Sequence, residues 1–216
     1  MELNGYAITG SLFIAGAVMT WLGWVLLPVK FGAYFAPEDF GKVRARFHYW
    51  IWMYRLHLFG YLVTVMAFAA LAALVAVGSA RVLVWPGVTV AAAGLLVTAL
   101  AHAFYYHFGA WGALETKGQS ESERNAYVDA LKVTTEYITC WIRFGRVFFG
   151  LGTLVLAAGL LFAGTLPLWM TLALAVLGLA PMITTMLFPD NLEYYQPIFH
   201  LQAAWLLLAG ILLILG

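Results

Sequence analysis

The chain has 216 residues, of which 64% are hydrophobic and 10% are charged, with a formal net charge of +1. Soluble domains average about 45–50% apolar and about 25% charged residues, so this composition indicates an integral membrane protein. The small net charge excludes an electrostatic nucleic-acid-binding surface, which needs an excess of basic residues. The single cysteine, Cys140, excludes an internal disulfide and a dithiol mechanism.

Six apolar runs follow one another, each long enough for a helix across a hydrocarbon core about 30 Å thick. None shows the period-two alternation of a membrane β-strand, so we predict an all-α polytopic bundle forming one membrane domain over residues 1–216. No removable signal peptide is recognisable, so the first run is expected to remain as a span. The predicted spans are about 6–27, 56–77, 82–106, 138–163, 166–188 and 198–215.

Two segments between the spans, about 37–54 and 120–136, are predicted to be amphipathic helices at the cytoplasmic membrane surface. The first begins with Pro37 and two acidic residues and then mixes basic with aromatic residues, as an interfacial helix does. The second offers Ser120 and Glu123 as a capping box and is expected to run into the fourth span. Both segments could equally be ordinary amphipathic connectors.

Charge is distributed unevenly between the two sides of the predicted bundle. All basic residues except Arg81, and all five histidines, fall after the first, third and fifth spans or at the adjoining helix ends. The positive-inside rule then predicts a cytoplasmic (inner) membrane protein with both termini outside. The span centres hold no ionisable residue, which disfavours an ion translocator and favours a site at the cytoplasmic leaflet.

Histidines from three spans are expected at similar depth near that leaflet. The candidates are His57 in the second span, His102 and His107 at the end of the third, and His200 at the start of the sixth. Two imidazoles from different helices suit the axial ligation of a b-type haem, and we expect His57 and His102 in that role. His200 would replace one of them or bind a quinone headgroup.

Geometry and charge refine this haem or quinone hypothesis. His102 and His107 are five residues apart, about 140° around a helix, so both cannot face one ligand. Arg143 and Arg146 are candidate anion clamps for haem propionates or a quinone. The alternative for each histidine is a structural position at the membrane interface, where an apolar ring with a polar edge is stable.

A second hypothesis is a metal-dependent enzyme acting on a lipid or other amphiphile at the inner leaflet. A non-haem metal ion would activate water or oxygen there. The candidate ligands are His57, His102, His200, Glu136, Asp190 and Glu193. No pair has a known metal spacing such as HExxH, and Asp190 and Glu193 could instead neutralise the two arginines.

A third hypothesis is a non-catalytic scaffold or assembly subunit of a larger complex. Aromatic residues on the cytoplasmic side would then contact other membrane subunits, and the histidines would be interface residues. Under all three hypotheses the lipid bilayer is a partner and nucleic acid is not. The sequence leaves open the substrate and whether the protein is an enzyme.

Overall fold

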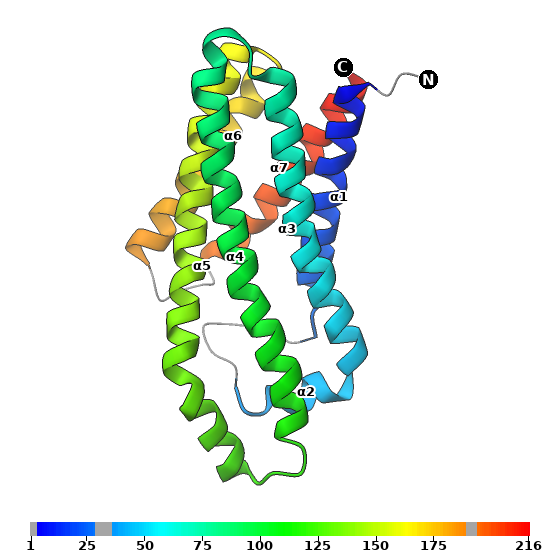
Figure 1. The fold of residues 1–216 in the computed structure, drawn as a ribbon, viewed down its shortest axis with the longest axis vertical. Helices are drawn as coiled ribbons and strands as arrows, with labels where there is room; N and C mark the ends of the chain where they lie inside the picture. Colours follow the sequence, from blue (N-terminus) through cyan, green and yellow to red (C-terminus); the bar gives the residue numbers. More distant parts are fainter. Residues whose placement is uncertain (1–3, 29–35, 189–193) are drawn as a thin grey trace.

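The computed structural model describes residues 4–28, 36–188 and 194–216, which form helices and no strand (Figure 1). A short 3₁₀ turn, η1, spans Gly78–Ala80. The α-helices are α1 (Gly5–Val25), α2 (Asp39–Ala45), α3 (Phe47–Val75), α4 (Arg81–Glu115), α5 (Glu121–Ala163), α6 (Leu168–Leu187) and α7 (Tyr195–Leu215).

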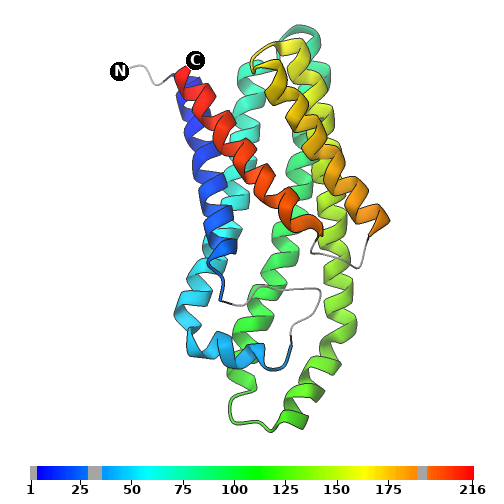
Figure 2. The same ribbon diagram turned by 180° about the vertical axis from the view of Figure 1, so that it is seen from behind.

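Six of these helices, all except α2, are long and apolar enough to cross a membrane. The prediction of an all-α, multi-pass membrane protein is therefore confirmed. Helices α4 and α5 have 35 and 43 residues, far more than the roughly 20 that a span needs. Their extra length projects past the last residue of α1 and the first residue of α7. Together with α2 and the start of α3, it forms a lobe at that end of the bundle (Figures 1 and 2).

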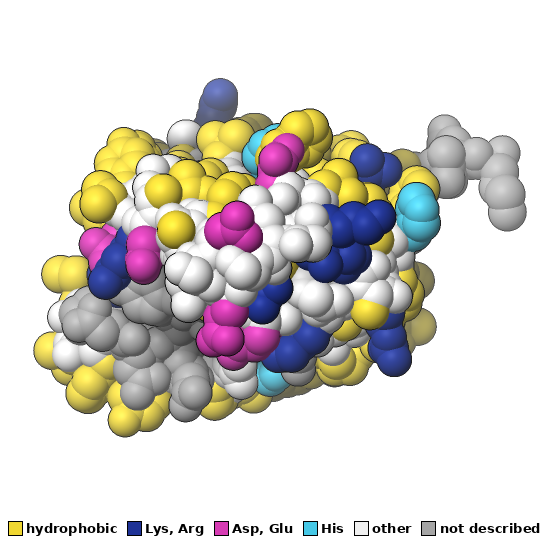
Figure 3. Space-filling model, turned by 90° about the horizontal axis from the view of Figure 1, so that it is seen from below, with side chains coloured by type: hydrophobic (Ala, Val, Ile, Leu, Met, Phe, Trp, Pro, Cys, Tyr) yellow, Lys and Arg dark blue, Asp and Glu magenta, His cyan; other side chains and the backbone are white. Residues whose placement is uncertain are grey.

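The two ends of the bundle differ in chemistry. Both termini lie at one end, as an even number of spans requires (Figure 1). Viewed from the opposite end, acidic, basic and histidine side chains share one face (Figure 3). We call this the charged end; it consists of α2, the first turns of α3 and α5, and the last turns of α4.

The structure does not show the two predicted segments as amphipathic helices lying on a membrane surface. Residues 37–54 divide into α2, a bend at Arg46 with φ −131° and ψ 40°, and the start of α3. Residues 120–136 are the first part of α5, which continues unbroken into its apolar span. The predicted capping box is confirmed: the Glu123 N–H donates to Ser120 Oγ over 3.3 Å, and the Ser120 N–H donates to Glu123 Oε2 over 2.7 Å.

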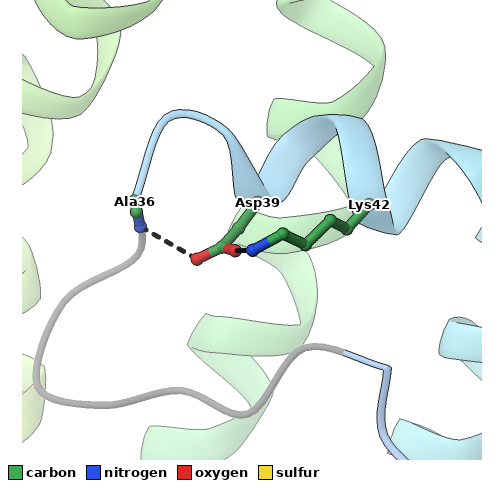
Figure 4. A network of polar contacts seen from close by, with 3 residues as sticks. All are labelled: Ala36, Asp39 and Lys42. Atoms are coloured by element: carbon green, nitrogen blue, oxygen red, sulfur yellow. Dashed lines mark hydrogen bonds and ion pairs between the residues drawn. The ribbon is translucent and has the colours of Figure 1, made fainter.

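Asp39 holds the start of α2 in place. Its carboxylate accepts hydrogen bonds from the Ala36 N–H over 3.2 Å and from Lys42 Nζ over 2.7 Å (Figure 4). This hydrogen bond and the carboxylate charge raise the pKa of the exposed Lys42 ammonium above its usual value. On the buried face of α2, Phe40 lies against Gly112 of α4, where an added Cβ would overlap the phenyl ring. Helix α2 is thereby packed on α4.

Glycines allow the backbones of two helix pairs to approach closely, as is common between membrane helices. A Cβ added at Gly23 of α1 would lie 2.5 Å from the N atom and 2.7 Å from the Cα atom of His57 in α3. A Cβ added at Gly94 of α4 would overlap the backbone nitrogen of Phe149 in α5. The α1–α3 and α4–α5 seams therefore set the depth at which His57 and Phe149 lie.

Two apolar cores lie one after the other along the bundle. One surrounds Phe13, Phe68 and Leu156 in the membrane helices, and the other surrounds Phe40 and Trp50 near the charged end. All five of these side chains are completely buried. The candidate site lies where the two cores meet.

Replacing Gly23 by alanine should destabilise the protein by about 1–3 kcal/mol, because the new methyl group meets the His57 backbone and no rotamer relieves the overlap. A detergent-denaturation titration of purified protein measures this. Gly41→Ala is the matched control, since nothing lies within 4 Å of the added Cβ there. Equal stability of the two variants would contradict the close α1–α3 contact.

Candidate functional site

His57 on α3 and His102 on α4 meet inside the bundle. Their ring centroids are 5.1 Å apart and their planes are nearly perpendicular, at 79°. The side chains are buried, with 1% and 8% of their surfaces exposed. The structure thus brings together the two histidines that the sequence analysis paired as ligands.

Hydrogen bonds hold both imidazoles at Nδ1. His57 Nδ1 lies 2.8 Å from the carbonyl oxygen of Thr20 on α1, and because a carbonyl only accepts, Nδ1 carries the hydrogen. In a neutral ring this leaves His57 Nε2 as an acceptor. That atom is buried and has no hydrogen-bond partner among the described residues. His102 Nδ1 lies 3.3 Å from the hydroxyl oxygen of Tyr54.

Aromatic rings enclose the histidine pair. The Trp24 ring lies 5.5 Å from His57 and 5.8 Å from His102, between ring centroids. Tyr61 packs edge-on against His57 at 4.8 Å, and Phe199 of α7 lies 6.3 Å from the same ring. These aromatic rings account for the burial of the two imidazoles.

A cavity of about 60 Å³ opens beside His102, between α1, α3, α4, α5 and α7. Its walls combine apolar side chains with several polar ones. The polar side chains in these walls are Thr20, Tyr61, Thr64, Thr98, His102, Arg146, Tyr195 and Gln202. Among the described lining residues, Arg146 is the one with a permanent charge, and none is a carboxylate.

A chain of contacts holds Arg146 in this wall. The guanidinium carbon lies 3.8 Å from the centroid of the Tyr195 ring, a cation–π contact. The Tyr195 hydroxyl donates to Gln202 Oε1 over 2.9 Å, and Gln202 Nε2 donates to the Leu177 carbonyl over 3.2 Å. Pro181, four residues after Leu177, has no N–H, so it leaves that carbonyl without its usual helical partner. Gln202 therefore replaces a missing backbone hydrogen bond of α6.

Four predicted cofactor-binding residues do not line this cavity: His57, His107, His200 and Arg143. His200 on α7 is exposed, and its Nδ1 accepts a hydrogen bond from Trp21 Nε1 over 2.9 Å. His107 on α4 is also exposed and stacks on Trp111, with ring centroids 5.5 Å apart. Arg143 is partly buried on α5 but does not line the cavity.

The carboxylates of the metal hypothesis do not join the histidine pair in the part of the chain that the structure describes. Glu136 is exposed on α5, and Asp190 and Glu193 lie outside the described residues. Within residues 4–28, 36–188 and 194–216, no three His, Cys, Asp or Glu side chains gather as metal ligands.

Sequence reasoning gave no site role to Tyr54, Tyr195 or Gln202, all of which now contact a site residue or each other. One signal was available for Gln202. A proline inside a span, here Pro181, leaves a carbonyl that needs a donor from a neighbouring helix, and Gln202 is an amide on the next span.

No protein-family model matches the chain, and no curated protein or solved structure matches it either. Function is therefore inferred from the chemistry of the site itself. That chemistry consists of two enclosed imidazoles and a guanidinium beside a small cavity, near the level where α1 ends and α7 begins.

Replacing Gln202 by leucine should cost about 1–3 kcal/mol of stability, because the Leu177 carbonyl loses its donor in a buried position. In a Pro181→Ala background the backbone N–H at position 181 can serve that carbonyl, so the same replacement should cost less. A double-mutant cycle, measured by denaturant titration, gives the difference. An equal loss in both backgrounds would contradict this role of Gln202.

Proposed function

We propose that this protein is a redox subunit of the membrane that holds a b-type haem through His57 and His102. The observation that carries the proposal is the meeting of two buried imidazoles from different helices. Haem iron in cytochromes is held by such side-chain ligands, and a ligating histidine usually donates its other ring N–H to a carbonyl or carboxylate. His57 has this arrangement: Nδ1 donates to the Thr20 carbonyl, and Nε2 is buried without a partner among the described residues.

The two side chains are of the type that ligates haem iron. The two rings contact each other edge to face, so binding a haem between them requires the rings to part. A bound haem would supply one-electron transfer, and the chain's own residues would orient and insulate it. The Thr20 carbonyl orients His57, Tyr54 orients His102, and the Trp24 ring excludes water. Arg143 is the proposed cationic partner of the haem carboxylates.

The proposal includes a membrane orientation. The charged end is placed in the cytoplasm and both termini outside, following the positive-inside rule. Helix α2 and the first turns of α5 then lie at the cytoplasmic surface of the inner membrane. A redox subunit needs an electron donor or acceptor, and other membrane subunits are the proposed partners.

The haem proposal predicts the visible spectra of four histidine variants. Protein expressed with ample haem should show a Soret band and sharp α and β bands on reduction, and His57→Ala or His102→Ala should abolish or greatly reduce them. His107→Ala and His200→Ala are the matched controls, because these exposed residues lie outside the pair, and they should keep full haem. Haem-free wild-type protein, or full haem in both of the first two variants, would contradict the proposal.

The orientation has its own test in a bacterial host. Alkaline phosphatase fused after Gly216 should be active, because the fusion would lie in the periplasm. In a Cys140→Ser background, Lys117→Cys in the exposed α4–α5 connection should react with a membrane-impermeant thiol reagent only after cell lysis. Labelling of Lys117→Cys in intact cells would reverse the assigned orientation.

A further inference from the structure

We infer that the cavity beside His102 binds the headgroup of a quinone, a flat ring with carbonyl oxygens carried on an apolar chain. The inference deepens the redox function proposed above, on which it rests, by naming the class of electron-transfer substrate. It depends on the charge in the cavity, on the shape and chemistry of its walls, and on its depth in the bundle.

The charge in the cavity favours a ligand that offers oxygen acceptors. Arg146 brings five N–H donors into a wall whose described residues include no carboxylate. Its contact with the face of Tyr195 is favourable for the charge but provides no oxygen acceptor. An arginine placed within a span commonly marks a substrate site. A quinone carbonyl is an acceptor that suits this donor.

The neighbouring polar groups leave Arg146 as the main donor. The Tyr195 hydroxyl and the Gln202 amide are engaged with each other and with the Leu177 carbonyl. They hold the tyrosine ring under the guanidinium and so orient Arg146. Because His102 also lines the cavity, a ring bound there would lie beside a proposed haem ligand. No further electron carrier would be needed between haem and quinone.

The apolar walls indicate an amphiphile rather than a small soluble ion. Phe149 and Phe199 give the cavity flat aromatic sides. A second cavity of about 10 Å³ lies against it, sharing Phe149, Gln202 and Leu206 as walls and reaching α3 and α6. Its lining is almost entirely apolar. This small space extends the apolar wall of the main cavity, and burying apolar ligand surface against that wall is favourable.

The depth of the cavity also suits a membrane-soluble ligand. Thr20 lies five residues before the end of α1 at Val25, and Tyr195 is the first residue of α7. The cavity is therefore within about two turns of the ends of these short spans. A quinone whose chain stays in the hydrocarbon core can present its polar head at this level.

The inference is tested by titrating the protein in nanodiscs with decylubiquinone and following tryptophan fluorescence. Trp24 is a suitable reporter, because its ring lies 5.8 Å from His102 and 6.3 Å from Phe199, which both line the cavity. We expect saturable quenching that Trp24→Phe largely removes. Arg146→Gln should weaken binding at least about tenfold. Arg55→Gln, which removes an exposed arginine near the same end, should leave the affinity within about twofold.

Two further variants keep the test decisive if Arg146→Gln does not fold. Ala203→Leu adds side-chain volume to an apolar part of the cavity wall and should abolish binding. Arg146→Lys keeps the charge but loses the planar set of donors, so it should bind with intermediate affinity. Wild-type affinity in both variants would overturn the inference. Competition with oleate separates the two sources of an oxygen acceptor: binding of oleate, but not of the quinone, in an Arg146-dependent manner would also overturn it.

The haem spectrum of the same samples separates this inference from the proposed function. Haem-containing protein without saturable quinone binding would overturn the quinone site alone. Saturable, Arg146-dependent quinone binding in protein without haem would overturn the haem proposal alone. Retention of haem by Arg146→Gln together with lost quinone binding would support both.

Discussion

The close approach of α1 to α3 is the constraint on which the site depends. Gly23 lets the α1 backbone reach the His57 backbone, and one turn earlier the Thr20 carbonyl accepts the His57 Nδ1–H over 2.8 Å. A larger residue at position 23 would push the helices apart and break this bond. The position and tautomer of one proposed haem ligand thus follow from a contact between two backbones. The depth of His102 is determined independently, by the packing of α4 against α5.

Polar side chains of α7 connect a backbone carbonyl of α6 to Arg146 of α5. Pro181 removes one backbone donor from α6, Gln202 of α7 supplies another, and Tyr195 connects that amide to Arg146. In an apolar bundle each unsatisfied group costs several kcal/mol, so such contacts join helices that otherwise meet only through side-chain packing. The same contacts leave the guanidinium facing a cavity. The residues that connect these helices are therefore also residues that line the cavity.

The six spans and the proximity of His57 to His102 could be predicted from the sequence. Hydropathy located the six spans, and topology placed His57 and His102 at one depth, where the structure has their rings 5.1 Å apart. Helical spacing also predicted that His102 and His107 could not both face one ligand, and the structure has His102 buried and His107 exposed. These successes rest on local periodicity and on the fixed rise of a helix, which act within one segment.

Features that depend on the fit between helices could not be predicted. Nothing local indicated that residues 37–54 would bend at Arg46, or that Tyr54 would reach His102. The partnership of Tyr195 with Arg146 joins helices that are distant in sequence, and its geometry exists only after packing. The carboxylates Asp190 and Glu193 lie outside the described residues, so their part in the metal hypothesis stays a prediction.

The most direct test of the central claim is an electron paramagnetic resonance spectrum of the oxidised, detergent-purified wild-type protein. Ligation by two imidazoles from α3 and α4 predicts a low-spin ferric haem signal. A high-spin signal alone, or no haem signal after expression with ample haem, would contradict the claim that His57 and His102 together hold a haem.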